Sequence, residues 1–283
     1  MCLTCGCGDE ENIRVTTLDP RAAEDGPSGP ADHGHGHAHG HGHGHGHDHP
    51  DGHTHDHDAV GPDGLGEAAH TETLVLSERI LAKNDRLAEH NRNWLRERNI
   101  PAVNLMSSPG SGKTSLLERT IAELTGTREV CVIEGDQETL FDAERIRTAG
   151  ARAVQVNTGA GCHLDAPMVR DAIGALAPSE GSLLFIENVG NLVCPALFDV
   201  GEQVKVVVIS VTEGDDKPLK YPHMFTAADL VVVNKTDLLP YVDFDIAKLH
   251  QQARSLKPDV EIIALSVRHG DNLDAWYAWL HAL

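Results

Sequence analysis

Residues 102–115 read AVNLMSSPGSGKTS and join a short apolar run to a phosphate-binding loop pattern. The loop fits G-x-x-x-x-G-K-[ST], except that Ser107 stands where the first glycine is usual. Glycines let backbone N–H groups close around phosphates, Lys113 would neutralise the β/γ oxygens, and the Thr114 hydroxyl would coordinate Mg²⁺. An ordinary glycine-rich turn is the alternative, but the position between a strand and a helix favours the phosphate loop. The predicted nucleotide contacts are Gly110, Ser111, Gly112, Lys113, Thr114 and Ser115.

The same pattern of apolar runs continues downstream. The runs are VCVI, AVQV, LLFI, KVVVISV, LVVVN and EIIALS, and the stretches between them mostly resemble helices, such as SLLERTIAEL and FDIAKLHQQARSL. Unbroken apolar strands are typical of a sheet that is buried on both faces. The sequence therefore predicts an α/β fold, a P-loop domain over residues 101–283 with a doubly wound, mainly parallel sheet.

Residues 231–237, VVVNKTD, indicate which base the nucleotide carries. Asn234, Lys235 and Asp237 match the Asn-Lys-x-Asp signature of GTPases. The Asp237 carboxylate can accept hydrogen bonds from guanine N1–H and N2–H₂, a donor pair that adenine lacks. Alone, the tetrapeptide could be a polar turn, but both motifs occur in the expected order. The later stretch ALSVRHG offers the backbone N–H groups of Ser266 and Val267 to guanine O6.

Two acids follow other predicted strands, in VIEGDQET and LLFIENVGN. Asp136 and Glu187 should face the nucleotide crevice, where they can hold Mg²⁺ or its water ligands. The alternative for each acid is a helix cap or a solvated loop position. We expect Lys113, Thr114, Asp136 and Glu187 to carry catalysis, with Gly190 in the loop that senses the γ-phosphate.

The first 73 residues differ in composition from the rest. They contain almost no large apolar side chains and hold −12 of the formal net charge of −20. Gly, His, Asp and Pro dominate residues 19–70, so residues 11–70 are expected to form a disordered His-rich region that binds metal. Residues 71–100 should form one amphipathic helix that Pro101 closes. Its apolar rows are Ile80, Leu87 and Trp94, and Leu74, Leu81, Ala88 and Leu95.

Composition also excludes several classes of function. An acidic chain is a poor partner for nucleic acid or for an anionic membrane. No apolar stretch reaches the roughly 18 residues of a membrane span, and the N-terminus lacks the zones of a secretion signal. We therefore expect a cytoplasmic protein, in which the six cysteines are metal ligands or buried thiols and not disulfides.

Cysteines cluster in two places. Cys2, Cys5 and Cys7 form an N-terminal metal motif within residues 1–10, because three thiolates so close together can wrap one soft or borderline ion. The stretches GAGCHLD and NLVCP supply a second set, Cys162, His163 and Cys194. A single buried cysteine is usually a small hydrophobe, which is how we interpret Cys131. Cys194 stands out because it follows the loop expected to sense the γ-phosphate.

Seven stretches together resemble the HypB family, the GTPases that incorporate nickel into nickel-iron hydrogenases. They are CLTCGC, SSPGSGKT, IEGDQET, GAGCHLD, ENVGNLVCP, SVTEGDDKPLKYPHMF and NKTDLLPY. The similarity covers the N-terminal tip and residues 71–283, and serine is frequent in this family at the place of Ser107. Arg268 and His269 are less typical of the family's last loop.

The resemblance implies a nickel metallochaperone that uses GTP and Mg²⁺. It implies a tight nickel site at Cys2, Cys5 and Cys7. It also implies a second site for Ni²⁺ or Zn²⁺ at Cys162, His163 and Cys194, in the interface of a homodimer formed on binding GTP and metal. The implied partners are the precursor of the hydrogenase large subunit and other hydrogenase maturation proteins. Binding and hydrolysis of GTP would gate the transfer of metal.

The histidine run of residues 33–58 places twelve imidazoles in 26 residues. Alternating glycines suit a store with many weak sites for borderline ions such as nickel and zinc. A purification tag or a solvating linker are the alternatives. For the whole protein, the alternatives are a nickel or zinc buffer with a vestigial nucleotide site, and the related nickel GTPase of urease maturation. The predicted ligands are His33, His35, His37, His39, His41, His43, His45, His47, His49, His53, His55 and His57.

Overall fold

This computed structural model describes residues 14–18, 65–136, 141–159 and 161–283. The chain divides into two units, one of Met1–Arg21 with Arg79–Leu283 and one of Ala22–Glu78. Of the second unit only residues 65–78, the first turns of a helix, are described. The fold below is that of the first unit, which carries every predicted site residue that the structure describes.

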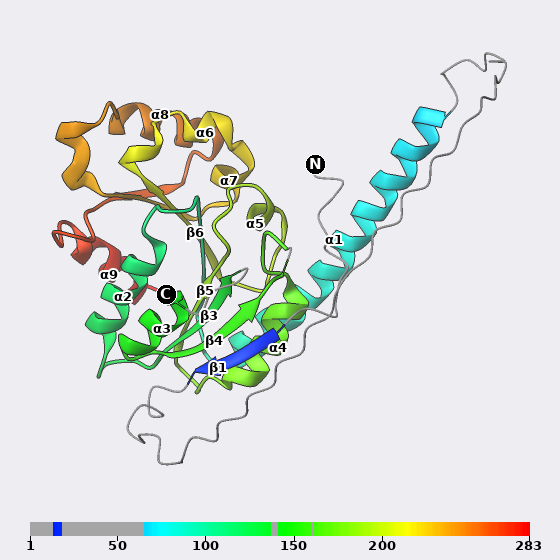
Figure 1. Ribbon diagram of the computed structural model, residues 1–283, viewed down its shortest axis with the longest axis horizontal. Coiled ribbons are helices and arrows are strands. Elements are labelled where there is room, and N and C mark those ends of the chain that lie inside the picture. Colours follow the sequence, from blue (N-terminus) through cyan, green and yellow to red (C-terminus); the bar gives the residue numbers. More distant parts are fainter. Residues whose placement is uncertain (1–13, 19–64, 137–140, 160) are drawn as a thin grey trace, which may run out of the picture. The chain divides into compact units, whose positions relative to one another are not determined.

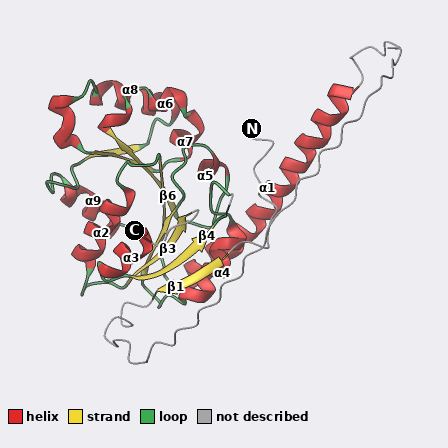
Figure 2. Ribbon diagram, viewed as in Figure 1, coloured by secondary structure: helices red, strands yellow, loops and turns green. Residues whose placement is uncertain are grey.

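An eight-stranded sheet forms the centre of the described domain, in the order β1-β4-β3-β5-β2-β6-β7-β8 (Figures 1 and 2). All neighbouring strands are parallel except β1 and β4. From β2 the chain builds one side of the sheet through β3 and β4, returns to β5, and then builds the other side through β6, β7 and β8. The predicted doubly wound, mainly parallel sheet is therefore confirmed. The strands are β1 Arg14–Leu18, β2 Ala102–Ser107, β3 Val130–Asp136, β4 Arg152–Asn157, β5 Leu183–Glu187, β6 Val204–Ser210, β7 Leu230–Asn234 and β8 Glu261–Ala264.

Helices connect the strands and cover both faces of the sheet (Figure 2). The topology places the carboxyl end of β2 where the connections diverge to the two sides, which is where open α/β sheets bind their ligands. The helices are α1 Leu65–Glu97, α2 Lys113–Leu124, α3 Phe141–Thr148, α4 Ala166–Leu176, α5 Cys194–Leu197, α6 Lys217–Lys220, α7 Pro222–Ala227, α8 Ile246–Leu256 and α9 Leu273–His281, with 3₁₀ turns η3 Val211–Glu213 and η4 Thr236–Tyr241.

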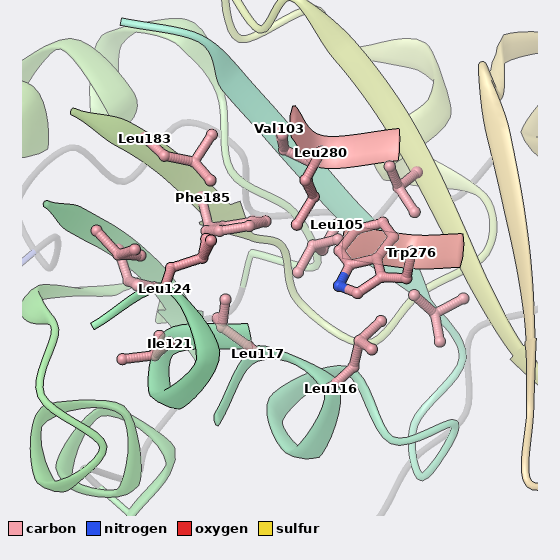
Figure 3. Packing of buried hydrophobic residues seen from close by; sticks show 14 of the residues in the cluster. Val103, Leu105, Leu116, Leu117, Ile121, Leu124, Leu183, Phe185, Trp276 and Leu280 are labelled. Atoms are coloured by element: carbon pink, nitrogen blue, oxygen red, sulfur yellow. The ribbon is translucent and has the colours of Figure 1, made fainter. Parts of the chain in front are cut away.

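The core lies in two layers because successive strand residues point to opposite faces. Val103 and Leu105 of β2 face α2 and α9, where they pack with Leu117 and Trp276 (Figure 3). The indole Nε1–H of Trp276 donates to Thr120 Oγ1 at 2.8 Å, so its polar atom is satisfied inside this layer. On the other face, α1 and α4 pack against β3, β4 and β5, and α7 and α8 pack against β6 and β7.

Strand β1 corrects one expectation. Its sequence RVTTL lies inside residues 11–70, which were expected to be disordered, yet it pairs antiparallel with β4 from Arg14 opposite Asn157 to Leu18 opposite Ala153. Valine and threonine favour strands, and the pairing covers the backbone edge of β4. The expectation is therefore wrong for these five residues. Residues 19–64 lie outside the described residues.

Helix α1 also differs from its predicted form. It begins at Leu65, six residues before the predicted Thr71, and ends at Glu97. In the row of Leu74, Leu81, Ala88 and Leu95 the last two are buried, whereas Ile80 of the other row is 48% exposed. The described residues include no helix long and apolar enough to cross a membrane.

Candidate functional site

The loop between β2 and α2 closes around Lys113. Gly112 has φ +98°, a backbone conformation that glycine adopts without strain. A Cβ atom at Gly112 would lie 2.5 Å from Asn234 Nδ2, which donates to the Ser111 carbonyl at 2.9 Å. Lys113 Nζ donates to Ser107 Oγ at 3.0 Å and is thereby held across the loop. Gly112 is thus required both by the turn and by the approach of Asn234.

Buried acids meet the first turn of α2. The Thr114 hydroxyl donates to Glu187 Oε1 at 2.7 Å, and Lys113 Nζ lies 4.0 Å from the same oxygen. Burial raises the pKa of Glu187, while the charge of Lys113 opposes that rise. Burial, followed by the charges of Glu187 and Asp136, raises the pKa of Glu134 to about 9.

The acid cluster has unused oxygens. Glu134 Oε2 and Glu187 Oε2 are buried and have no hydrogen-bond partner among the described residues. Hard divalent cations such as Mg²⁺ take carboxylate, hydroxyl and water oxygens. The donor set of Thr114, Asp136 and Glu187 therefore fits Mg²⁺, whose positive charge would offset the burial of the Glu187 carboxylate.

The phosphate loop and the acids line one cavity of about 530 Å³. Gly190 also lines this cavity, and a Cβ atom added there would meet Pro109 at 3.1 to 3.3 Å. Arg145 adds a cation to the wall of the cavity, next to Ser115, whose Oγ accepts from Arg145 Nη2 at 3.3 Å. The predicted residues in this wall are Gly110, Ser111, Gly112, Lys113, Thr114, Ser115, Asp136, Glu187, Gly190 and Lys235.

The predicted base-reading residues join three loops. Asn234 Oδ1 accepts from the Val267 N–H at 3.2 Å, while its amide nitrogen holds the phosphate loop. Lys235 Nζ donates to the Gly110 carbonyl at 2.7 Å. Ser266 Oγ donates to Asp237 Oδ1 at 2.6 Å, and this hydrogen bond lowers the pKa of Asp237. Asp237 is therefore ionised at neutral pH and can act as an acceptor only.

Cys162, His163 and Cys194 come together as the sequence predicts. Their ligand atoms all lie within 4.8 Å of one another, with 3.0 Å between the two Sγ atoms and 3.7 Å from Cys162 Sγ to His163 Nδ1. Burial lowers the pKa of His163 to about 4. The ring centroids of His163 and Phe198 lie 4.0 Å apart, so the two rings are packed together. A neutral imidazole and two thiols form a donor set that fits nickel or zinc.

One side chain connects this cluster to the nucleotide cavity. Asn188, which directly follows Glu187, lines the cavity. Its Oδ1 accepts from the Leu164 N–H at 3.0 Å, and Leu164 follows His163 in the chain. Its amide nitrogen donates a hydrogen bond to Asn104 Oδ1 at 3.4 Å. Asn188, which adjoins Glu187, thus holds the backbone of Leu164, which adjoins His163.

Comparison with known proteins identifies the family. Residues 101–264 match the model of the nucleotide-binding domain shared by CobW, HypB and UreG. The chain is 46% identical over 285 aligned residues to the hydrogenase maturation factor HypB of Escherichia coli K12, which covers 99% of this chain and 98% of that protein. The chain belongs to the HypB family.

Other relatives agree with this assignment. The HypB of Azotobacter vinelandii is 56% identical over 212 residues, which is 75% of this chain and 70% of that protein. The crystal structure of HypB from Helicobacter pylori in complex with nickel matches with a TM-score of 0.66 and 39% identity, over 71% of this chain and 94% of that chain. This member of the HypB family is accordingly a P-loop GTPase.

The structure does not describe every predicted ligand. Cys2, Cys5, Cys7 and the histidines of residues 33–57 lie outside the described residues. Asp237, Ser266 and Val267 lie together but do not line the 530 Å³ cavity. Sequence reasoning missed Glu134, Arg145 and Asn188. Glu134 lies two positions before Asp136, and Asn188 directly follows Glu187. This closeness to predicted site residues is the signal that could have found them.

Proposed function

We propose that this HypB family member is a nickel metallochaperone that stores nickel and delivers it to the precursor of the hydrogenase large subunit. GTP binding and hydrolysis gate the transfer. The observation that carries the proposal is the hydrogen bond from the Leu164 N–H to Asn188, because it joins the backbone of the metal cluster to the strand end that bears Glu187. The nickel complex of the Helicobacter pylori relative supports nickel as the cargo.

The gating follows from competition for Thr114. Its hydroxyl now bonds to Glu187, and a Mg²⁺ ion bound with GTP would take that hydroxyl as a ligand. Glu187 would then need a new position or a water-mediated contact. Since Asn188 follows it directly, a shift at Glu187 displaces the Leu164 backbone and changes the spacing at His163.

The remaining parts of the proposal concern the other metal sites, the homodimer and the partners. Cys2, Cys5 and Cys7 bind one nickel ion tightly, and the histidine run stores further nickel or zinc. Cys162, His163 and Cys194 bind nickel or zinc where two copies of the chain meet in a GTP-dependent homodimer. The protein acts in the cytoplasm with other hydrogenase maturation proteins, and with neither nucleic acid nor membrane.

Nickel titration of the full-length protein tests the gating, with GDP in one series and a non-hydrolysable GTP analogue in the other. The site at Cys162, His163 and Cys194 is identified as the nickel binding that is lost in Cys194→Ser. We expect its nickel affinity to differ between GDP and the GTP analogue. We expect Asn188→Ala to remove this difference between the two nucleotides. Cys131→Ala is the matched control, because Cys131 is buried in the core and is not one of the grouped ligand residues. Equal affinities in both nucleotide states would refute the coupling and favour a metal buffer.

A further inference from the structure

Two asparagines on the buried face of α1 make hydrogen bonds outside their own helix. Asn84 and Asn91 are 5% and 2% exposed. Asn84 Nδ2 donates to the Asp199 carbonyl at 2.7 Å, and Asn84 Oδ1 accepts from the Ala166 N–H at 2.9 Å. Asn91 Nδ2 donates to the carbonyls of Ala166 at 2.9 Å and Val200 at 3.1 Å. Each amide therefore bridges the same two segments of the domain.

Those two segments carry the two halves of the metal cluster. Ala166 begins α4, three residues after His163. Asp199 follows Phe198, whose ring packs on the His163 imidazole, and comes five residues after Cys194. Between these segments the cluster itself is held by side-chain contacts at Cys162 and Cys194. Helix α1 thus connects the start of α4, which follows His163, to residues 199–200, which follow Cys194.

The approach of α1 is tight and specific. Gly201 has φ +94°, and a Cβ atom there would lie 2.6 Å from both the Ala88 carbonyl oxygen and Asn91 Cβ. The Arg92 guanidinium forms two hydrogen bonds with the Asp199 carboxylate, at 2.7 and 2.5 Å. Buried amides left without partners are costly, so the four hydrogen bonds of Asn84 and Asn91 favour a single register of α1 on these segments.

We propose that Asn84 and Asn91 are positioning residues for the Cys162–His163–Cys194 cluster, and that α1 sets the spacing between its two halves through them. This inference rests on the proposed function of the cluster as a metal site. Groups hydrogen-bonded directly to metal ligands usually change metal affinity by about 10 to 100-fold when they are removed, and Asn84 and Asn91, which act through the backbone next to the ligands, should reach the lower part of that range. Helix α1 also connects the His-rich segment to the domain in sequence, so a change in the position of α1 would reach the cluster by this route.

Cobalt binding tests the proposal, because thiolate-to-cobalt absorption reports directly on cysteine ligands. For this test, Cys2→Ser, Cys5→Ser and Cys7→Ser are introduced into the full-length protein. The remaining thiolate absorption then arises from Cys162 and Cys194. In this background, Asn91→Ala and Asn84→Ala should each weaken cobalt binding about tenfold or more. They should also alter the d–d spectrum at saturation, which a purely destabilised protein would not do.

Two controls make the result specific. Asn93→Ala replaces an exposed asparagine of the same helix and should leave cobalt affinity and spectrum unchanged. GDP affinity, measured on every variant, should remain within about twofold of the parent, since the asparagines do not touch the nucleotide cavity. Asn84→Ala keeps both bonds of Asn91, so it provides a folded variant if Asn91→Ala does not fold.

The outcomes separate this inference from the proposed function. No thiolate absorption in the parent protein would refute the metal site itself. Absorption in the parent with the same affinity and spectrum in Asn84→Ala and Asn91→Ala would overturn the positioning role and leave the site standing. A parallel loss of GDP and cobalt affinity in both variants would also overturn it, because the asparagines would then stabilise the domain as a whole.

Discussion

The Thr114 hydroxyl donates its hydrogen bond to Glu187 Oε1 at 2.7 Å. The hydroxyl predicted to bind Mg²⁺ and the carboxylate predicted to support it are therefore paired with each other. Lys113 Nζ lies 4.0 Å from the same oxygen and provides the adjacent positive charge. Binding of nucleotide with Mg²⁺ would rearrange this triad, and its members are consequently the most direct targets for mutation.

Lys113→Ala should reduce GTP hydrolysis by about 100-fold or more, because it removes the ammonium that would neutralise charge on the β/γ oxygens. Phosphate release under single-turnover conditions measures the effect. Nickel bound at Cys2, Cys5 and Cys7 should remain, since these residues belong to a separate segment. Lys83→Ala, at an exposed position of α1, is the control. If Lys113→Ala strips the N-terminal metal, the two sites are not independent.

Gly112→Ala and Gly110→Ala form a matched pair. Both glycines have positive φ, but an added Cβ meets Asn234 Nδ2 at 2.5 Å only at Gly112, while at Gly110 it meets nothing within 4 Å. We expect Gly112→Ala to weaken GDP binding at least about tenfold more than Gly110→Ala, because Asn234 must move away from the phosphate loop and from Val267. Isothermal titration with GDP measures both. Equal losses would show that backbone strain alone accounts for the effect.

Asp237→Asn should weaken GTP binding and improve binding of xanthosine triphosphate. The amide can donate to the C2 carbonyl of xanthine, which the Asp237 carboxylate repels. Competition between the two nucleotides gives the base preference directly. Asp243→Asn, at an exposed position nearby in sequence, should leave it unchanged. An unaltered preference in Asp237→Asn would remove the guanine assignment.

Glu134→Gln should stabilise the nucleotide-free protein at alkaline pH. The folded pKa of Glu134 is about 9, above its ordinary value of 4.5, so folding favours the protonated carboxyl. This favourable contribution is complete below pH 4.5 and is lost as the pH rises through 9. Urea unfolding should show a gain that is absent near pH 4.5 and grows to about 5 kcal/mol at pH 8. The exposed Glu123→Gln is the control, and a gain independent of pH would contradict the burial argument.

Deleting residues 33–57 should remove most weak nickel sites and leave GTP turnover unchanged. Since neutral imidazole is the ligand and its unperturbed pKa is about 6.5, the capacity lost in the deletion should be large at pH 7.5 and small at pH 5.5. In cells, hydrogenase maturation should suffer only when nickel is scarce. An equal loss of hydrogenase activity at low and high nickel, with matched protein levels, would show that the run takes part in transfer and not in storage.

Local sequence predicts much of this fold because its strands are short unbroken apolar runs. The run LVVVN coincides with β7, and AVNLM and VCVI begin β2 and β3 at the observed residues. Such runs bury both faces and need no information from distant residues. The phosphate and base motifs are equally local, and the structure brings them to one edge of the sheet.

What sequence reasoning missed depends on contacts between distant residues. Strand β1 has a short polar sequence, and only its partner β4 makes it a strand. Asn84 and Asn91 interrupt the apolar face of α1, and their role depends on carbonyls more than 70 residues away in the chain. The raised pKa of Glu134 likewise arises from burial and from neighbouring acids that only the fold assembles.

The direction of β1 determines where the N-terminal cysteines are attached. Arg14 lies opposite Asn157, so the chain before Arg14 departs from the same end of the sheet as the chain that leads from Asn157 to Cys162. Cys7 is seven positions before Arg14, and Cys162 is five positions after Asn157. Fully extended, these tethers reach no further than about 25 Å and about 18 Å. The pairing of β1 with β4 thus sets an upper limit on the distance that the segment before Arg14 must span to reach the Cys162 loop.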